Sequence, residues 1–360
     1  MTGLFQPLKF KSGAVMKNRF MLAPMTNTQS HTDGRLSDDE YHWLTMRAKG
    51  GFGVTMTCAS HVQANGKGFP GQLGCFSDDH LEGLTRLAAG IKAEQSLAVL
   101  QLHHAGMRSP QEEIGEQPVC PSDNEETGAR ALTLDEVERL KEDFVFAAER
   151  AKKAGFDGVE IHGAHGYILC QFLSPTINQR IDQYGGSLEN RARIIFEIID
   201  CIRQRCGDDF LLGVRLSPER FDLRLGEILE VSQRLLSEVQ IDFLDMSLWD
   251  SFKEPVEEAY QGRTLLSYFT ELDRGDVRLG TAGKIHRPDD ARRCLEAGAD
   301  IVILGRAAIL HHDFPRQVQG NPEFEPVKLP VSREYLRSQG LGEAFVNYMT
   351  RWKGFVKESG

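Results

Sequence analysis

The chain has 360 residues, of which 41% are hydrophobic and 26% are charged, as in a globular protein with a sizeable core. Its net charge of −10 argues against nucleic acid as the main partner, because phosphate binding requires a basic face. No apolar run reaches the length of a membrane span, and the first residues lack the pattern of a signal peptide. Seven cysteines without a CxxC pair are typical of free thiols in a reducing compartment. We therefore expect a cytoplasmic protein with no membrane partner.

Eight short apolar runs of strand length recur along the chain, and most are bounded by glycine or polar residues. They cover residues 20–24, 53–57, 97–102, 158–161, 211–216, 243–247, 277–279 and 300–304. Segments with helical periodicity lie between most of them. Thr133 and Glu136 predict a capping box at the start of one such helix. Ser187 and Pro288 predict the starts of two others.

Strands that alternate with helices predict a parallel sheet, and eight units without an intervening linker predict a closed (β/α)8 TIM barrel of the α/β class. An open doubly wound sheet is the weaker alternative, because the eight units use nearly the whole length. We expect one domain over residues 1–360, with a hairpin-like cap at the N-terminus and a helical extension over residues 321–360. In such a barrel the C-terminal ends of all strands meet at one rim, where ligands bind.

Residues 160–167 read EIHGAHGY and place His162, His165 and Tyr167 just after the fourth predicted strand. Two imidazoles can donate hydrogen bonds to one oxygen while a phenol moves a proton, so we expect the catalytic centre here. An HxxH pair also occurs in metal sites and among core histidines. No CxxC or carboxylate–histidine pair nearby supplies further ligands, so we expect no metal.

Other predicted strands also end in polar or glycine-rich segments. Thr26 follows the first strand, Gln101 lies at the end of the third and Arg215 at the end of the fifth. Glycines follow the seventh and eighth strands, in Gly283-Lys284 and Gly305-Arg306, where barrels often bind phosphate through backbone N–H groups. The rim therefore predicts a cofactor that carries a phosphate.

Residues 66–71, GKGFPG, match the residue pattern GxGxxG of dinucleotide-binding folds but lack its structural context. That fingerprint needs a strand immediately before it and a helix that opens from it, and neither is predicted here. We expect a glycine-rich surface loop.

These residues, in this order, resemble the Old Yellow Enzyme family of FMN-dependent ene-reductases. The resemblance runs from about residue 4 to about residue 315, and its most specific segment is 156–193, FDGVEIHGAHGYILCQFLSPTINQRIDQYGGSLENRAR. The HAG at 104–106 and the AGAD and LGR within 297–306 support it. The resemblance implies an enzyme that uses NADH or NADPH to reduce the C=C bond of small α,β-unsaturated carbonyl compounds or similarly activated alkenes.

The resemblance also implies a role for each matching residue. His162 and His165 would hydrogen-bond the substrate carbonyl, and Tyr167 would donate the proton. Thr28 and Trp249 would be further substrate contacts. FMN, bound non-covalently, would be held by Pro24, Met25, Thr26, Ala59, Gln101, Arg215, Gly283, Lys284, Gly305 and Arg306. Of these, Arg215 would lie beside the pyrimidine ring and the last four would lie at the phosphate.

The chain departs from the family pattern at three positions of the rim. Cys58 stands where many relatives carry Glu, Met107 follows the HAG where Arg is common, and Thr28 stands where some members place a tyrosine. The substrate contacts of these loops are therefore left open.

The C-terminal tail carries a stripe of side chains at helical spacing, namely Phe345, Tyr348, Met349, Trp352 and Phe355. This stripe is more typical of packing against the barrel or a partner subunit than of a substrate site. The second case would make the protein a homo-oligomer.

Three other functions stay open at this point. A dienoyl-CoA or amine-type relative would add a cysteine cluster for iron–sulfur and a further domain, whereas the cysteines of this chain are scattered. A metal-dependent barrel hydrolase would use His162 and His165. A non-catalytic flavin-binding protein would hold FMN without reacting with enones.

Overall fold

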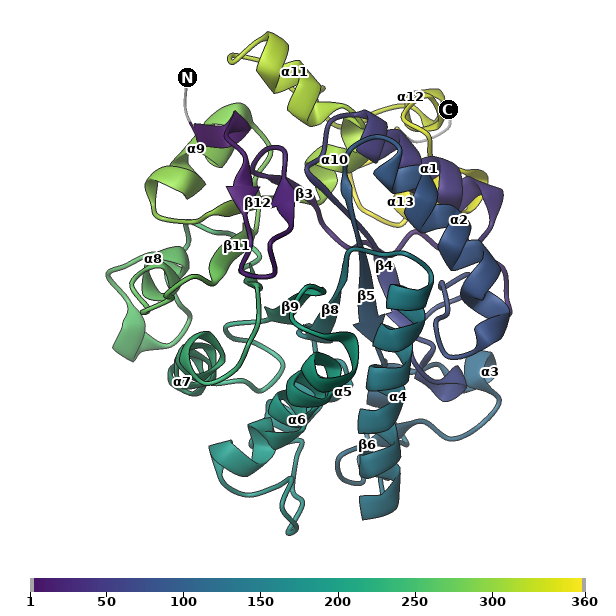
Figure 1. The fold of residues 1–360 in the computed structure, drawn as a ribbon, viewed down its shortest axis with the longest axis vertical. Coiled ribbons are helices and arrows are strands. Elements are labelled where there is room, and N and C mark those ends of the chain that lie inside the picture. The colour runs from purple at the N-terminus through teal and green to yellow at the C-terminus, as the bar shows by residue number, and fades with distance from the viewer. Residues whose placement is uncertain (1–2, 358–360) are drawn as a thin grey trace.

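The computed structural model describes residues 3–357 and contains a closed barrel of eight parallel strands (Figure 1). Around the barrel the strands follow in the order β10-β11-β12-β3-β4-β5-β8-β9. Their bounds are β3 (Phe20–Leu22), β4 (Val54–His61), β5 (Leu97–His103), β8 (Gly158–Gly163), β9 (Leu211–Leu216), β10 (Phe243–Ser247), β11 (Arg278–Ala282) and β12 (Ile301–Leu304). Each strand overlaps one of the eight predicted apolar runs, so the prediction of a (β/α)8 barrel is confirmed.

A helix follows each barrel strand and packs on the outside of the barrel. These helices are α1 (Asp38–Lys49), α2 (Leu81–Lys92), α4 (Leu134–Lys153), α6 (Leu188–Cys206), α7 (Leu225–Ser237), α8 (Leu265–Thr270), α9 (Pro288–Glu296) and α10 (Arg306–Leu310). The predicted starts of three of them are confirmed. Thr133 and Glu136 form a reciprocal capping box at α4, the Ser187 hydroxyl accepts from the backbone of α6, and Pro288 is the first residue of α9.

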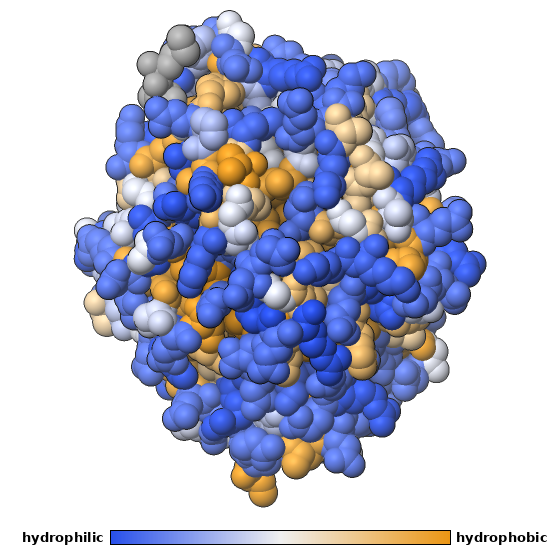
Figure 2. All heavy atoms as spheres, in the orientation of Figure 1, coloured by the Kyte–Doolittle hydropathy of each residue, from blue (hydrophilic) through white to orange (hydrophobic). Residues whose placement is uncertain are grey.

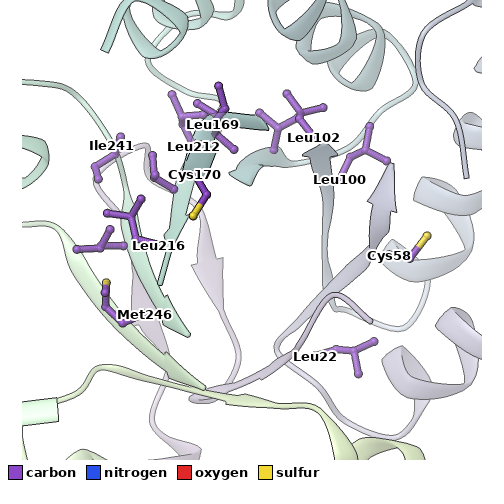
Figure 3. Packing of buried hydrophobic residues seen from close by; sticks show 14 of the residues in the cluster. Leu22, Cys58, Leu100, Leu102, Leu169, Cys170, Leu212, Leu216, Ile241 and Met246 are labelled. Atoms are coloured by element: carbon purple, nitrogen blue, oxygen red, sulfur yellow. The ribbon is translucent and has the colours of Figure 1, made fainter. Parts of the chain in front are cut away.

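Two apolar layers hold the barrel together. The larger one lies between the strands and the surrounding helices, and Figure 3 shows some of its members, among them Leu100 and Leu102 of β5 and Leu216 of β9. The smaller one fills the interior of the barrel. An N-terminal hairpin of β1 (Leu8–Lys9) and β2 (Val15–Met16) contributes to this inner layer, so the predicted cap is confirmed.

The remaining short elements lie in the loops or follow the barrel. They are β6 (Val119–Cys120), β7 (Arg130–Ala131), α3 (Gln111–Ile114), α5 (Ile168–Leu173), α11 (Phe314–Gly320), α12 (Arg333–Ser338) and α13 (Glu343–Thr350). The helical extension predicted over 321–360 is partly confirmed within residues 321–357, whereas 358–360 lie outside the described residues. Residues 321–332 are not helical, because prolines at 322, 326 and 330 interrupt helix formation. Beyond them α13 packs on α1, where the Trp43 and Phe345 ring centroids lie 4.8 Å apart (Figure 1).

The visible face of the protein is mostly hydrophilic, with apolar side chains in separate groups (Figure 2). None of the helices within residues 3–357 is both long and apolar enough to cross a membrane.

Candidate active site

The rim at the C-terminal ends of the barrel strands has a strained backbone. Seven non-glycine residues with positive φ angles, between 50° and 69°, follow barrel strands at this end. They are Thr28, His165, Arg220, Phe221, Asp222, Trp249 and Lys284. Residues with side chains seldom adopt this conformation, and when they do they tend to cluster at functional sites. The strain therefore makes this rim the candidate functional end of the barrel, which is the end where the sequence analysis expects the site.

A cavity of about 380 Å³ opens at the same rim. That volume lies within the range of small-molecule and cofactor sites. Ten of the predicted site residues line it, namely Pro24, Met25, Thr26, His165, Arg215, Trp249, Gly283, Lys284, Gly305 and Arg306. Five others, Thr28, Ala59, Gln101, His162 and Tyr167, do not line this cavity.

His162, His165 and Tyr167 form one cluster at the end of β8. The ring centroid of His162 lies 5.1 Å from that of His165 and 5.2 Å from that of Tyr167. His103, at the end of the neighbouring β5, lies 4.3 Å from the Tyr167 ring in an edge-to-face arrangement. The Nε2 atom of His165 lies 2.7 Å from the hydroxyl of Ser247 at the end of β10. The structure thus joins the three predicted residues and adds two groups from other strands.

Arg108 holds the Tyr167 phenol from the side of the loop that follows β5. Its guanidinium lies 4.7 Å from the centre of the Tyr167 ring, and it donates a hydrogen bond to the backbone oxygen of His165. A guanidinium over an aromatic face is an attractive contact. Although Met107 occupies the usual arginine position of the family, the next residue supplies an arginine at the site.

Burial disfavours the charged form of His162, His165 and the neighbouring His103. Burial lowers the pKa of His162, His165 and His103 well below the ordinary value of 6.5, and neighbouring basic groups lower it further. Burial raises the pKa of Tyr167, while the nearby Arg108 charge acts in the opposite direction. The site therefore offers neutral imidazole N–H groups and a protonated phenol at physiological pH.

We expect the free energy of unfolding to fall between pH 7.5 and pH 5.5, because neutral histidines are buried. Burial lowers the pKa of His61 to about 4 and that of His104 to about 3, whereas the unfolded chain titrates near 6.5. Below pH 6.5 the unfolded state binds more protons, so stability is lost as the pH falls. At pH 5.5 the loss is about 1.4 kcal/mol for each histidine, or about 3 kcal/mol for these two.

Urea unfolding at the two pH values measures this loss. His104→Gln should remove its share of the pH dependence. Equal unfolding free energies of the natural protein at pH 7.5 and pH 5.5 would contradict the buried neutral histidines.

Four backbone N–H groups beside the cavity have no hydrogen-bond acceptor within residues 3–357. They belong to Gly283 and Lys284 after β11 and to Gly305 and Arg306 after β12. Unpaired N–H groups from two neighbouring turns fit a phosphate. The side chain of Lys284 is exposed, and its Nζ atom lies 3.0 Å from a carboxylate oxygen of Asp250.

Two interpretations of the sequence need correction. The glycine-rich loop at 66–71 is not a simple surface loop, because Gly66 and Gly71 are buried. A Cβ at Gly66 would lie 2.5 Å from the His104 ring, and one at Gly71 would lie 2.4 Å from the Thr28 carbonyl oxygen. The stripe of the tail packs on the barrel as expected, but four of its members also line the cavity, namely Phe345, Tyr348, Met349 and Trp352.

The described part of the chain, residues 3–357, contains no group of three or more His, Cys, Asp or Glu side chains arranged to hold a metal ion. His162 and His165 are instead surrounded by aromatic rings, Ser247 and arginine.

The sequence profile of the NADH:flavin oxidoreductase / NADH oxidase family matches residues 3–324. The chain belongs to this family. It is 37% identical over 358 residues to a probable NADH-dependent flavin oxidoreductase, YqiG of Bacillus subtilis, with 96% of each chain covered. Its structure also resembles the Old Yellow Enzyme homologue of Zymomonas mobilis, with a TM-score of 0.80, 27% identity and coverage of 96% and 99%. Morphinone reductase gives a TM-score of 0.78 with 28% identity and 96% coverage of each chain.

Some proteins that are similar to this chain are much longer than it is. The NADH:fumarate oxidoreductase of Klebsiella pneumoniae is 33% identical over 349 residues, which are 92% of this chain but 38% of that protein. Membership of the family makes the chain an NAD(P)H-dependent flavin oxidoreductase. The alternative of a metal-dependent barrel hydrolase is therefore excluded. FMN is the cofactor of the family, and the cavity with its unpaired N–H groups fits it.

Proposed function

We propose that this enzyme reduces the C=C bond of α,β-unsaturated carbonyl compounds, or of similarly activated alkenes, at the expense of NADH or NADPH. The observation that carries this proposal is the cluster of His162, His165 and Tyr167 at the edge of the FMN cavity. Reduction of an enone requires hydrogen-bond donors at the carbonyl oxygen and an acid that protonates the α-carbon. The two histidines would be the donors and Tyr167 would be the acid.

The cavity residues would hold FMN through backbone and side-chain groups. Of these, Pro24 and Met25 would offer backbone groups. Ala59 and Gln101, which do not line the cavity, would contribute a backbone group and a contact to the ring edge from just outside it. Thr26 lines the cavity, and its hydroxyl would donate to the cofactor. Bound FMN would supply the hydride transfer between the nicotinamide and the substrate.

His162 would donate from its Nε2 atom. Its Nδ1 atom accepts a hydrogen bond from the backbone N–H of Ala164 at 3.2 Å, so in the neutral ring the proton lies on Nε2. For His165, the hydroxyl of Ser247 accepts from Arg215 at 3.5 Å and can then give its own hydrogen to Nε2. That arrangement leaves the proton of His165 on Nδ1 as the second donor.

Both donors act most strongly in the transition state. Negative charge grows on the carbonyl oxygen as the alkene is reduced, and fixed N–H groups stabilise it more than they stabilise the neutral substrate. Tyr167 would then give its proton to the α-carbon. Arg108 over its ring stabilises the phenolate that remains and holds the phenol in place. Thr28 and Trp249 would contact the rest of the substrate.

We expect Arg215→Ala to weaken the retention of FMN roughly ten- to hundredfold, because a charged hydrogen bond contributes about 1.5–3 kcal/mol. The ratio of FMN to protein after gel filtration, and a titration of the apoprotein with FMN, measure the change. Arg139→Ala on the exposed face of α4 is the matched control. FMN occupancy equal to that of the natural protein would place Arg215 outside the cofactor site.

Steady-state turnover without oxygen tests the proposed activity. The purified holoenzyme should convert 2-cyclohexenone to cyclohexanone and consume one NADH or NADPH for each product molecule. Oxidation of the nicotinamide only when oxygen is present, with no saturated ketone formed, would contradict the proposal.

A further inference from the structure

A layer of buried polar side chains crosses the barrel interior just below the rim. It consists of Gln101 on β5, Glu160 on β8, Arg215 on β9 and Asp245 on β10, four strands that are neighbours in the barrel. All four are buried, with 0–4% of their surface exposed. The interior of such a barrel is usually filled by branched apolar residues, so a charged layer here needs an explanation.

Two polar contacts lie within this layer, one at each of its ends. Gln101 donates from Nε2 to Oε1 of Glu160 at 2.6 Å. Arg215 lies with its Nε atom 3.0 Å from Oδ2 of Asp245, close enough for an ion pair although the N–H is not aligned as a hydrogen bond. Oε2 of Glu160 and both carboxylate oxygens of Asp245 have no hydrogen-bond donor within residues 3–357.

The charges of this layer do not balance if both acids are ionised. One guanidinium would face two carboxylates, which leaves a net charge of −1 inside the barrel. Two carboxyl groups can share a buried site only when one of them keeps its proton. Burial raises the pKa of Glu160 well above its usual range, and the charge of Asp245 raises it further. Asp245 has the ion-pair contact with Arg215, so it is the better carboxylate of the two.

We propose that Glu160 is a neutral carboxylic acid that shares its proton with Asp245, and that Asp245 neutralises Arg215. The two acids are then positioning residues, because they set how much of the Arg215 charge acts on bound FMN. The part that concerns FMN rests on the proposed cofactor site, whereas the part that concerns the proton does not.

The proposal has opposite consequences for the two acids. Glu160→Gln replaces one neutral group by another of the same shape, so the charge beside the cofactor does not change. Asp245→Asn removes the negative charge that neutralises Arg215, so the guanidinium favours electrons on the flavin more strongly. If Glu160 were ionised, Glu160→Gln would act like Asp245→Asn.

Infrared spectroscopy of the apoprotein tests whether the Glu160 carboxyl group carries a proton. The difference spectrum of apoprotein minus Glu160→Gln should contain the C=O stretch of a protonated carboxylic acid. Glu40 is another buried acid whose pKa is raised by burial, and it provides the control. The Glu40→Gln protein still contains Glu160, so its spectrum should retain the band that Glu160→Gln removes. Its absence from the difference spectrum would overturn the shared proton, whether or not the protein binds FMN.

The two-electron reduction potential of bound FMN tests how far Asp245 and Glu160 neutralise the charge of Arg215. Glu160→Gln should leave the potential unchanged. Asp245→Asn should raise the reduced-to-oxidised ratio at a fixed potential at least tenfold, which corresponds to about 30 mV. A rise of the same size in Glu160→Gln would show that Glu160 is ionised and overturn the proposal. An unchanged potential in Asp245→Asn would overturn the effect on FMN. If Asp245→Asn does not fold, Glu160→Gln and the infrared band still decide.

Discussion

Tyr167→Phe is expected to slow the reoxidation of the reduced enzyme by 2-cyclohexenone on the order of 10²–10⁴-fold, the usual contribution of a general acid. Reduction by NADH or NADPH should stay within about twofold of the natural rate, because no proton from Tyr167 is needed in that half of the reaction. The phenylalanine ring keeps the contacts of the phenol with His103 and Arg108, so only the hydroxyl is lost. Anaerobic stopped-flow absorbance measures the two half-reactions separately.

Tyr41→Phe is the matched control for this variant. Tyr41 lies on α1, and its ring stacks on Arg86 away from the histidine cluster. Removal of its hydroxyl should change neither half-reaction. If Tyr167→Phe is reoxidised by the enone as fast as the natural enzyme, the proton comes from another source, such as water.

His162→Ala is expected to lower enone turnover about 10²–10³-fold, the usual cost of losing one donor to a developing oxyanion. Binding of phenols, whose oxygen would occupy the place of the substrate carbonyl, should weaken as well. FMN should stay bound, because His162 does not line the cavity that the unpaired N–H groups flank. Steady-state kinetics, a phenol titration and the FMN-to-protein ratio measure the three quantities.

The exposed His42 on α1 supplies the control, and His42→Ala should behave like the natural enzyme. Loss of FMN from His162→Ala would mean that His162 supports the cofactor site. Unchanged turnover with FMN bound would remove His162 from the carbonyl site.

The barrel could be predicted from the sequence because its signals are local. Each strand is a short apolar run, and the start of α4 is decided by two residues three positions apart, Thr133 and Glu136. The extension over 321–360 was predicted less well. Its helical stripe marks α13, but three prolines separate that helix from the barrel, and a stripe does not say which surface it covers.

The candidate site could be predicted where its residues follow directly on a strand, because a closed barrel brings the C-terminal ends of its strands to one rim. His162, His165 and Tyr167 lie within six positions and form one cluster. Ser247 and His103 join them from other strands, and nothing near 162–167 indicates those partners. Gln101 and Arg215 are expected at the rim from their places at strand ends and from the resemblance, whereas the buried acids Glu160 and Asp245 on the neighbouring strands join them only in the folded barrel.

The cavity wall from the C-terminal tail could not be predicted from the sequence either. It consists of Phe345, Tyr348, Met349 and Trp352. They reach the cavity only because α13 and the turn that follows it pack back onto α1. Long-range contacts of this kind leave no local pattern in the sequence, so the wall that they form was found only in three dimensions.

The central claim is that one protein-bound flavin passes electrons from a nicotinamide to an activated alkene at the His162, His165 and Tyr167 cluster. An anaerobic visible spectrum of the purified holoenzyme tests it most directly, with addition of NADH or NADPH and then of 2-cyclohexenone. The account predicts a yellow protein that bleaches with the nicotinamide and recovers its colour with the enone. A bleached protein that stays bleached after the enone is added would contradict it.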